Sequence, residues 1–173
     1  TSSFKFLHGA EDTSSFKWTV DFWVKIDSFS ATQVLFSTVN SGGATVTGVY
    51  IPINTSRVIT TQIVRGVGGT NVVGDQFTTA YPDDSNWHHL VFTYDQSLAT
   101  GNSELFIDGV SAGTGDKSAN APSTANSTTA LRIGALGDDT EYFDGMVDEL
   151  RITKDRVLTI EEIKAAAKRR PYA

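Results

Sequence analysis

The chain has 173 residues, of which 39% are hydrophobic and 10% aromatic, and its formal net charge is −6. This length and composition are typical of a folded globular domain, and the negative charge disfavours nucleic acid and anionic membranes as partners. Because cysteine is absent, a disulfide framework and a thiolate nucleophile or metal ligand are excluded. No apolar run approaches the ~20 residues that a membrane-spanning helix needs. We therefore expect a single domain over residues 1–173, with no membrane insertion.

The first half of the chain alternates between apolar runs and polar turns. Residues 17–27 place five apolar side chains on one face, namely Trp18, Val20, Phe22, Val24 and Ile26. Strict alternation over this length predicts a long strand with one face in the core. Further strands are predicted at 4–7, 33–39, 46–53, 57–65 and 72–77, and the pair 46–53 and 57–65 should form a hairpin.

The middle of the chain predicts a three-stranded meander. Residues 87–95 place Leu90, Phe92 and Tyr94 on one face, and strands at 103–107 and 110–114 follow. The dipeptide Asp108-Gly109 joins the last two strands. Asp-Gly between alternating apolar runs predicts a type I′ turn, because this turn needs a positive φ at both central residues.

The last third of the chain contains a long loop, two strands and a helix. The loop is expected at 115–128, and the strands at 129–134 and 144–153 are separated by a second loop at 135–142. A helix is predicted over 160–170, since Thr159 and Glu162 have the spacing of a capping box. Short strands at intervals of roughly 8–12 residues, without βαβ alternation, predict a β-sandwich.

Four segments in this order resemble one known family. They are WTVDFWVKID at 18–27, WHHLVFTYD at 87–95, LFIDGV at 105–110 and FDGMVDELRITKDRVLTIEEI at 143–163. Together they are similar to the laminin-G-like, concanavalin A-like domains of the lectin and glucanase superfamily. The resemblance implies an all-β fold, an antiparallel two-sheet jelly-roll β-sandwich with one concave and one convex sheet. The residues add a short C-terminal helix to this fold.

Asp148 is the candidate metal ligand. In similar jelly rolls, the last strand supplies an acidic residue at this position to a structural calcium ion, together with carbonyl oxygens from the N-terminal segment. Calcium takes about six to eight oxygen ligands, so one carboxylate and several carbonyls can begin to form its site. The alternatives are that Asp148 caps a turn, or that Glu149 pairs with Arg151 or another basic group.

The carboxylates and histidines do not form a catalytic pattern. A jelly-roll glucanase needs two carboxylates across the scissile bond, which the family usually supplies from an E-x-D-x-x-E-like run on one strand. Asp21 is the lone carboxylate of its strand, and Asp148 and Glu149 are adjacent and should point to opposite faces. His88 and His89 should diverge in the same way, which favours packing over metal binding. We therefore expect that the protein is not an enzyme.

The second loop is the candidate ligand-binding site. Within 137–143 it concentrates Asp138, Asp139, Glu141 and Tyr142. Carboxylates accept hydrogen bonds from sugar hydroxyls, and an aromatic ring can stack on the apolar C–H face of a sugar. We select Asp138, Asp139 and Tyr142 as ligand-binding residues. The alternatives are a cation site formed by Asp138, Asp139 and Glu141, or a solvated acidic turn.

The sequence favours a non-catalytic, lectin-like binding module that recognises glycans within a larger surface, secreted or virion protein. Its expected partner is a carbohydrate or a protein on a cell or particle surface, and its expected location is extracellular, on a cell surface or on a virion. The alternative function is a structural or protein-adhesion module of a virus or phage particle or of an extracellular assembly. A glycoside hydrolase is the third and least favoured function.

Overall fold

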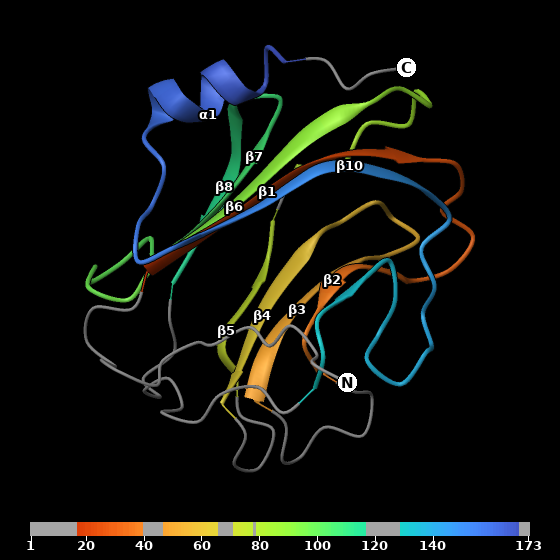
Figure 1. Ribbon diagram of the computed structural model, residues 1–173, viewed down its shortest axis with the longest axis horizontal. Helices are drawn as coiled ribbons and strands as arrows, with labels where there is room; N and C mark the ends of the chain where they lie inside the picture. The colour runs from red at the N-terminus through yellow and green to blue at the C-terminus, as the bar shows by residue number, and fades with distance from the viewer. Residues whose placement is uncertain (1–16, 40–46, 66–70, 78, 117–128, 170–173) are drawn as a thin grey trace.

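The computed structural model describes residues 17–39, 47–65, 71–77, 79–116 and 129–169, which form two antiparallel five-stranded sheets and one helix (Figure 1). Sheet A contains, in spatial order, β10 (Gly145–Lys154), β1 (Lys17–Ile26), β6 (His88–Asp95), β7 (Ser103–Ile107) and β8 (Val110–Gly115). Sheet B contains β5 (Asn71–Gln76), β4 (Thr60–Arg65), β3 (Thr47–Ile53), β2 (Gln33–Ser37) and β9 (Arg132–Ile133). The helix α1 spans Ile160–Ala166 and lies over sheet A on the side away from sheet B (Figure 1).

This arrangement confirms the predicted all-β sandwich with a short helix near the C-terminus. Several elements are shorter than predicted, and the largest differences are in β9 and α1. The strand expected at 129–134 is reduced to β9, which ends at Ile133 because Gly134 adopts a φ of 75° and the chain leaves the extended conformation there. The helix expected to reach residue 170 ends at Ala166. The strand predicted at 4–7 and most of the loop predicted at 115–128 lie outside the described residues.

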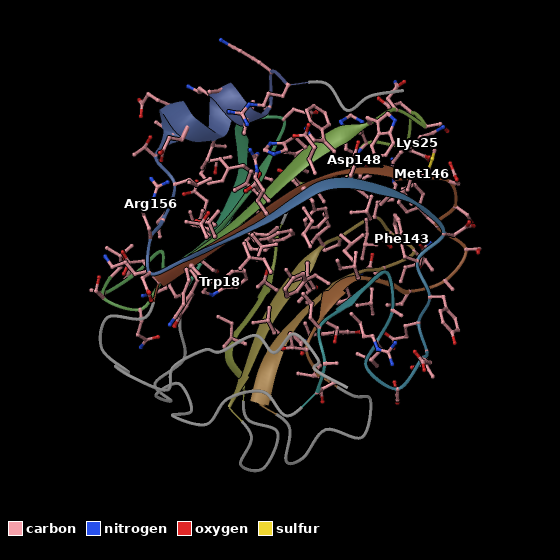
Figure 2. The ribbon with its side chains drawn as sticks, in the orientation of Figure 1. Trp18, Lys25, Phe143, Met146, Asp148 and Arg156 are labelled. Carbon is pink, nitrogen blue, oxygen red and sulfur yellow. The ribbon has the colours of Figure 1, made fainter. Side chains whose placement is uncertain are left out.

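The main core lies between the sheets. The predicted apolar face of β1 provides Trp18, Val20 and Phe22, which are at most 1% exposed, and Figure 2 shows Trp18 on the side of β1 that faces sheet B. Sheet B contributes Val49 and Ile51 to the same core, and both are fully buried. Each large apolar side chain buried in this way contributes about 1.5–3 kcal/mol to folding. The sandwich is therefore stabilised mainly by burial of the apolar faces that the alternation in the sequence predicts.

The opposite face of β1 is also buried, which the alternation did not predict. Thr19, Asp21 and Trp23 are all at most 5% exposed. The cover is provided by α1 and the segment before it, since Ile163 packs with Val91 of β6 and with neighbouring residues in a second, smaller apolar cluster. Sheet A is thus covered on both faces along β1 and β6. Among the described residues no helix is long and apolar enough to cross a membrane.

Candidate functional site

The segment 134–144, here called the 134–144 loop, connects β9 to β10 and is hydrogen-bonded to sheet B. The amide of Gly134 donates to the carbonyl of Leu35 at 3.2 Å, and the amide of Val34 donates to the carbonyl of Glu141 at 3.0 Å. Beneath the loop, Leu136 is 3% exposed and packs with Val34 in a small cluster separate from the main core. The loop is therefore seated on the second face of sheet B.

The backbone of this loop is fixed by its own hydrogen bonds. The amide of Leu136 donates to the carbonyl of Thr140 at 2.9 Å, and the amide of Asp139 donates to the carbonyl of Leu136 at 3.0 Å. Asp139 and Glu141 have φ angles of 59° and 52°. Positive φ is uncommon outside glycine and persists where the surroundings enforce it, which is a feature of loops that present side chains in a defined way.

The three predicted ligand-binding residues all lie on this exposed loop, and both carboxylates have partners. The hydroxyl of Thr140 donates to Asp138 at 2.9 Å, and Asp139 lies 3.2 Å from an Arg132 guanidinium nitrogen. The Tyr142 side chain is 65% exposed. A large, accessible ring on a hydrogen-bonded backbone is suited to stacking on a ligand. Assignment of these residues to a ligand stays a prediction.

The structure adds two residues that the sequence argument did not select. The hydroxyl of Tyr50, on β3, donates to the carboxylate of Glu141 at 2.5 Å across 91 positions of sequence. Burial and the nearby Glu141 carboxylate raise the pKa of Tyr50 above its usual range, so the phenol stays protonated as a donor. The alternation of β3, with Val49 and Ile51 in the core, shows that Tyr50 points outward. The alternation does not indicate that Glu141 is the partner of Tyr50.

His88 and His89 diverge as predicted and bind different carboxylates. His88 Nδ1 lies 2.6 Å from Asp108 and its Nε2 lies 3.0 Å from Asp84, while His89 Nε2 lies 3.3 Å from Asp21. The hydrogen bond to Asp108 raises the pKa of His88, and burial opposes this effect. The same ring bonded to Asp84 lowers the pKa of that carboxyl to about 2. His88 therefore joins the loop before β6 to the β7–β8 turn.

Asp148, the predicted calcium ligand, lies on β10 opposite Trp23, on the side of sheet A away from sheet B (Figure 2). Its carboxylate accepts the amide of Glu149 at 2.7 Å, and Glu149 has a φ of 50° at an irregularity in the β1–β10 pairing. The described residues contain no group of three or more acidic or histidine side chains that could hold a metal ion. One carboxylate accounts for only one or two of the roughly six to eight oxygens that calcium requires, and a calcium ion at Asp148 stays a prediction.

The described strands and loops define a lectin-like β-sandwich. Residues 2–164 match the family described as the concanavalin A-like lectin/glucanases superfamily, and the chain belongs to that superfamily. The resemblance drawn from the four sequence segments is confirmed by this match.

Comparison with solved structures agrees on the fold. The CBM40 carbohydrate-binding module of the Ruminococcus gnavus IT-sialidase superposes with a TM-score of 0.66 at 14% identity, covering 96% of this chain and 97% of that one. Domain 4 of an extracellular GH43 arabinanase from Geobacillus stearothermophilus, solved with arabinotriose, gives a TM-score of 0.59 at 21% identity, covering 97% and 73%. A Bacteroides ovatus protein gives 0.59 at 16% identity, and this chain covers 40% of its length. At these identities the similarity establishes the architecture.

Proposed function

We propose that this chain is a non-catalytic glycan-binding module and that the 134–144 loop forms its recognition surface. The observation that carries the proposal is the 65% exposed ring of Tyr142 on a loop whose backbone is hydrogen-bonded to sheet B. Binding residues on rigid β-scaffolds are found disproportionately on loops, because strand side chains are used in packing. Carbohydrate-binding modules among the structural neighbours support this function.

The environment of Asp21 supports the non-catalytic part of the proposal. This carboxylate is 1% exposed and bonded to Arg151 and His89. These bonds to two basic side chains give the Asp21 carboxylate a structural role. We further propose that the module acts outside the cell, as part of a larger surface, secreted or virion protein.

A glycan array tests the proposed function. We expect the wild-type protein to bind one or more glycans and Tyr142→Ala to lose most of that signal, while its melting temperature stays unchanged. Lys154→Ala, an exposed substitution on β10, serves as the control and should bind as the wild-type protein does. If the wild-type protein binds no glycan and self-associates instead, the structural or protein-adhesion function is favoured.

A further inference from the structure

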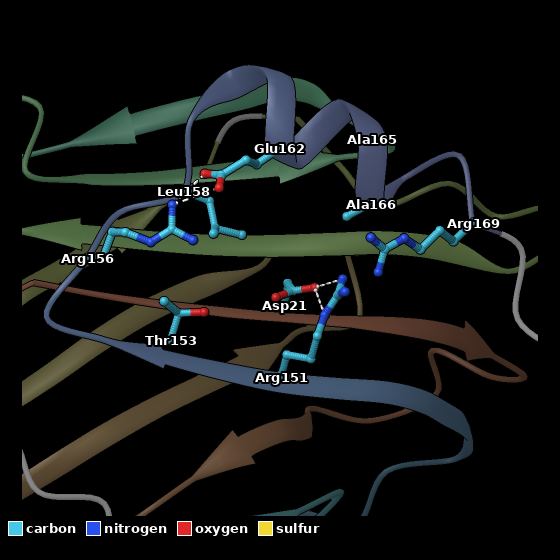
Figure 3. A pocket seen from close by; sticks show the side chains of 9 residues that line it. All are labelled: Asp21, Arg151, Thr153, Arg156, Leu158, Glu162, Ala165, Ala166 and Arg169. Carbon is cyan, nitrogen blue, oxygen red and sulfur yellow. Dashed lines mark hydrogen bonds and ion pairs between the residues drawn. The ribbon is translucent and has the colours of Figure 1, made fainter.

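A separate pocket lies between α1 and sheet A, away from the 134–144 loop. Its volume is about 330 Å³. It is lined from three directions: by β1 and β10 of sheet A, by the segment that precedes α1, and by α1 with the residues that follow it (Figure 3). The lining residues are Asp21, Arg151, Thr153, Arg156, Leu158, Glu162, Ala165, Ala166 and Arg169. Pockets for small ligands in proteins start at about 300 Å³, so this one suits a ligand the size of a single sugar ring.

The pocket carries an excess of positive charge on a protein that is negatively charged overall. Three arginines and two carboxylates line it, while the whole chain has a net charge of −6. Arg156 forms an ion pair with Glu162 at 2.7 Å, and Arg151 forms one with Asp21. The side chain of Arg169 forms no ion pair with any described residue. Arg169 is exposed, so an anion from solution can reach this residue.

Two guanidinium groups converge in the same part of the pocket. In Figure 3 the guanidinium of Arg169 points toward that of Arg151. Asp21 holds Arg151 in place, because the Nε of Arg151 donates to the Asp21 carboxylate at 2.9 Å. Asp21 is itself 1% exposed and is also bonded to His89. Like charges brought together repel, and a bound anion removes that repulsion. A carboxylate is the natural anion here, since its two oxygens match the planar donors of arginine.

The other walls of the pocket suit the rest of a sugar. The Thr153 hydroxyl and the Glu162 carboxylate provide groups that hydrogen-bond to hydroxyls, while Leu158 and Ala166 provide apolar surface for the C–H face of the ring. We propose that this pocket binds an acidic sugar, with its carboxylate between Arg151 and Arg169. The proposal rests on the proposed function only in taking the ligand to be a sugar.

Titration calorimetry with methyl glucuronide and methyl glucoside tests the proposal, because these sugars differ in a carboxylate against a hydroxymethyl group. We expect the glucuronide to bind and the glucoside to bind at least about tenfold more weakly, which is the usual worth of a charge-assisted hydrogen bond. Arg169→Gln should weaken glucuronide binding by a similar factor. Lys168→Gln removes the same charge from the neighbouring position, outside the pocket lining, and should leave binding unchanged.

Several outcomes would overturn the proposal. They are no binding of the glucuronide, equal binding of the two sugars, or equal effects of Arg169→Gln and Lys168→Gln. Acetate carries the carboxylate without the ring, so acetate binding as tight as that of the glucuronide would show a simple anion site. Amide chemical shifts distinguish this failure from failure of the proposed function: ligands of the pocket should perturb signals from α1, and glycans bound by Tyr142 should perturb the 134–144 loop.

Discussion

At the scale of single residues, His88 shows how one side chain connects two distant segments. Both of its ring nitrogens face carboxylates, Asp108 at 2.6 Å and Asp84 at 3.0 Å. A neutral imidazole donates from one nitrogen only, so both bonds are donated fully only when the ring is protonated. The Tyr81 ring packs edge-on against His88 with centroids 5.2 Å apart. His88 therefore contributes to stability in a way that depends on its charge.

The pH dependence of unfolding should reveal this contribution. The pKa of His88 is raised in the folded protein, so its stabilising effect is complete below the unfolded value of about 6.5 and is lost as the pH rises through the folded value. We expect the melting temperature of the wild-type protein to exceed that of His88→Gln by a few degrees at pH 6, and by less at pH 9. Thermal unfolding followed by circular dichroism measures both differences. A difference that is constant across this range would contradict the charged state.

At acidic pH, the stability of the protein should depend on the Asp84 carboxyl. The pKa of Asp84 is lowered to about 2 by its bond to His88, so its stabilising effect is present above the unfolded value of about 3.8 and is lost as the pH falls toward the folded value. The three-residue contact should therefore stabilise the protein most between about pH 4 and 6.5. Unfolding of Asp84→Asn at pH 3 and pH 6 tests this, and its difference from the wild-type protein should be larger at pH 6.

Tyr142 is the residue on which glycan recognition should depend. Its removal in Tyr142→Ala should weaken binding by about 1 kcal/mol if the ring stacks on the sugar, by analogy with aromatic pairs. Asp138→Ala and Asp139→Ala should also weaken binding while shifting the melting temperature little, because both side chains are exposed. Titration calorimetry with a glycan identified by the array measures all three effects. Wild-type affinity in all three variants would place the site elsewhere.

At the scale of secondary-structure elements, α1 covers a face of sheet A. The predicted capping box is confirmed: the Thr159 side chain accepts from the Glu162 amide, and the Glu162 side chain accepts from the Thr159 amide. An isolated seven-residue helix is unstable in water, so its stability here depends on packing. Ile163 provides this packing, since it is 1% exposed and contacts Val91 and Phe106.

Truncation of Ile163 should separate packing from intrinsic helix preference. Ile163→Ala removes a buried side chain without lowering helix propensity, and we expect a loss of about 2–4 kcal/mol in the free energy of unfolding. Lys164→Ala, at the exposed neighbouring position, should cost less than about 0.5 kcal/mol. Urea denaturation of the two variants provides the comparison. Similar values for both would show that α1 does not need this contact.

At the scale of the whole molecule, a structural calcium ion stays a prediction. If Asp148 is a ligand, a chelator should lower the melting temperature of the wild-type protein, because a ligand that binds only the folded state stabilises it. Asp148→Ala should melt at a temperature that no longer responds to the chelator. Asp144→Ala, an exposed acidic residue just before β10, controls for the loss of charge. An unchanged wild-type melt with chelator would reject the ion under those conditions.

The features that local sequence determined are those with a short-range physical cause. Alternation in β1 and β6 defined strands and a core face, because successive side chains of a strand point to opposite sides. Asp108 and Gly109 have φ angles of 52° and 77°, as the predicted turn requires. The candidate loop could be selected in the same way, since its carboxylates and Tyr142 are neighbours in sequence.

The remaining features depend on segments that meet only in the folded protein. The partner of Tyr50 lies 91 positions away in the sequence. The pocket under α1 is lined by Asp21, Arg151 and Arg169, which come from distant parts of the chain. Burial of the polar face of β1 follows from where α1 lies, which the period of β1 cannot specify. Local patterns encode the conformation of each segment and which of its sides is apolar. Packing between distant segments determines which sides face one another. This packing places the 134–144 loop on sheet B and forms the arginine-lined pocket under α1.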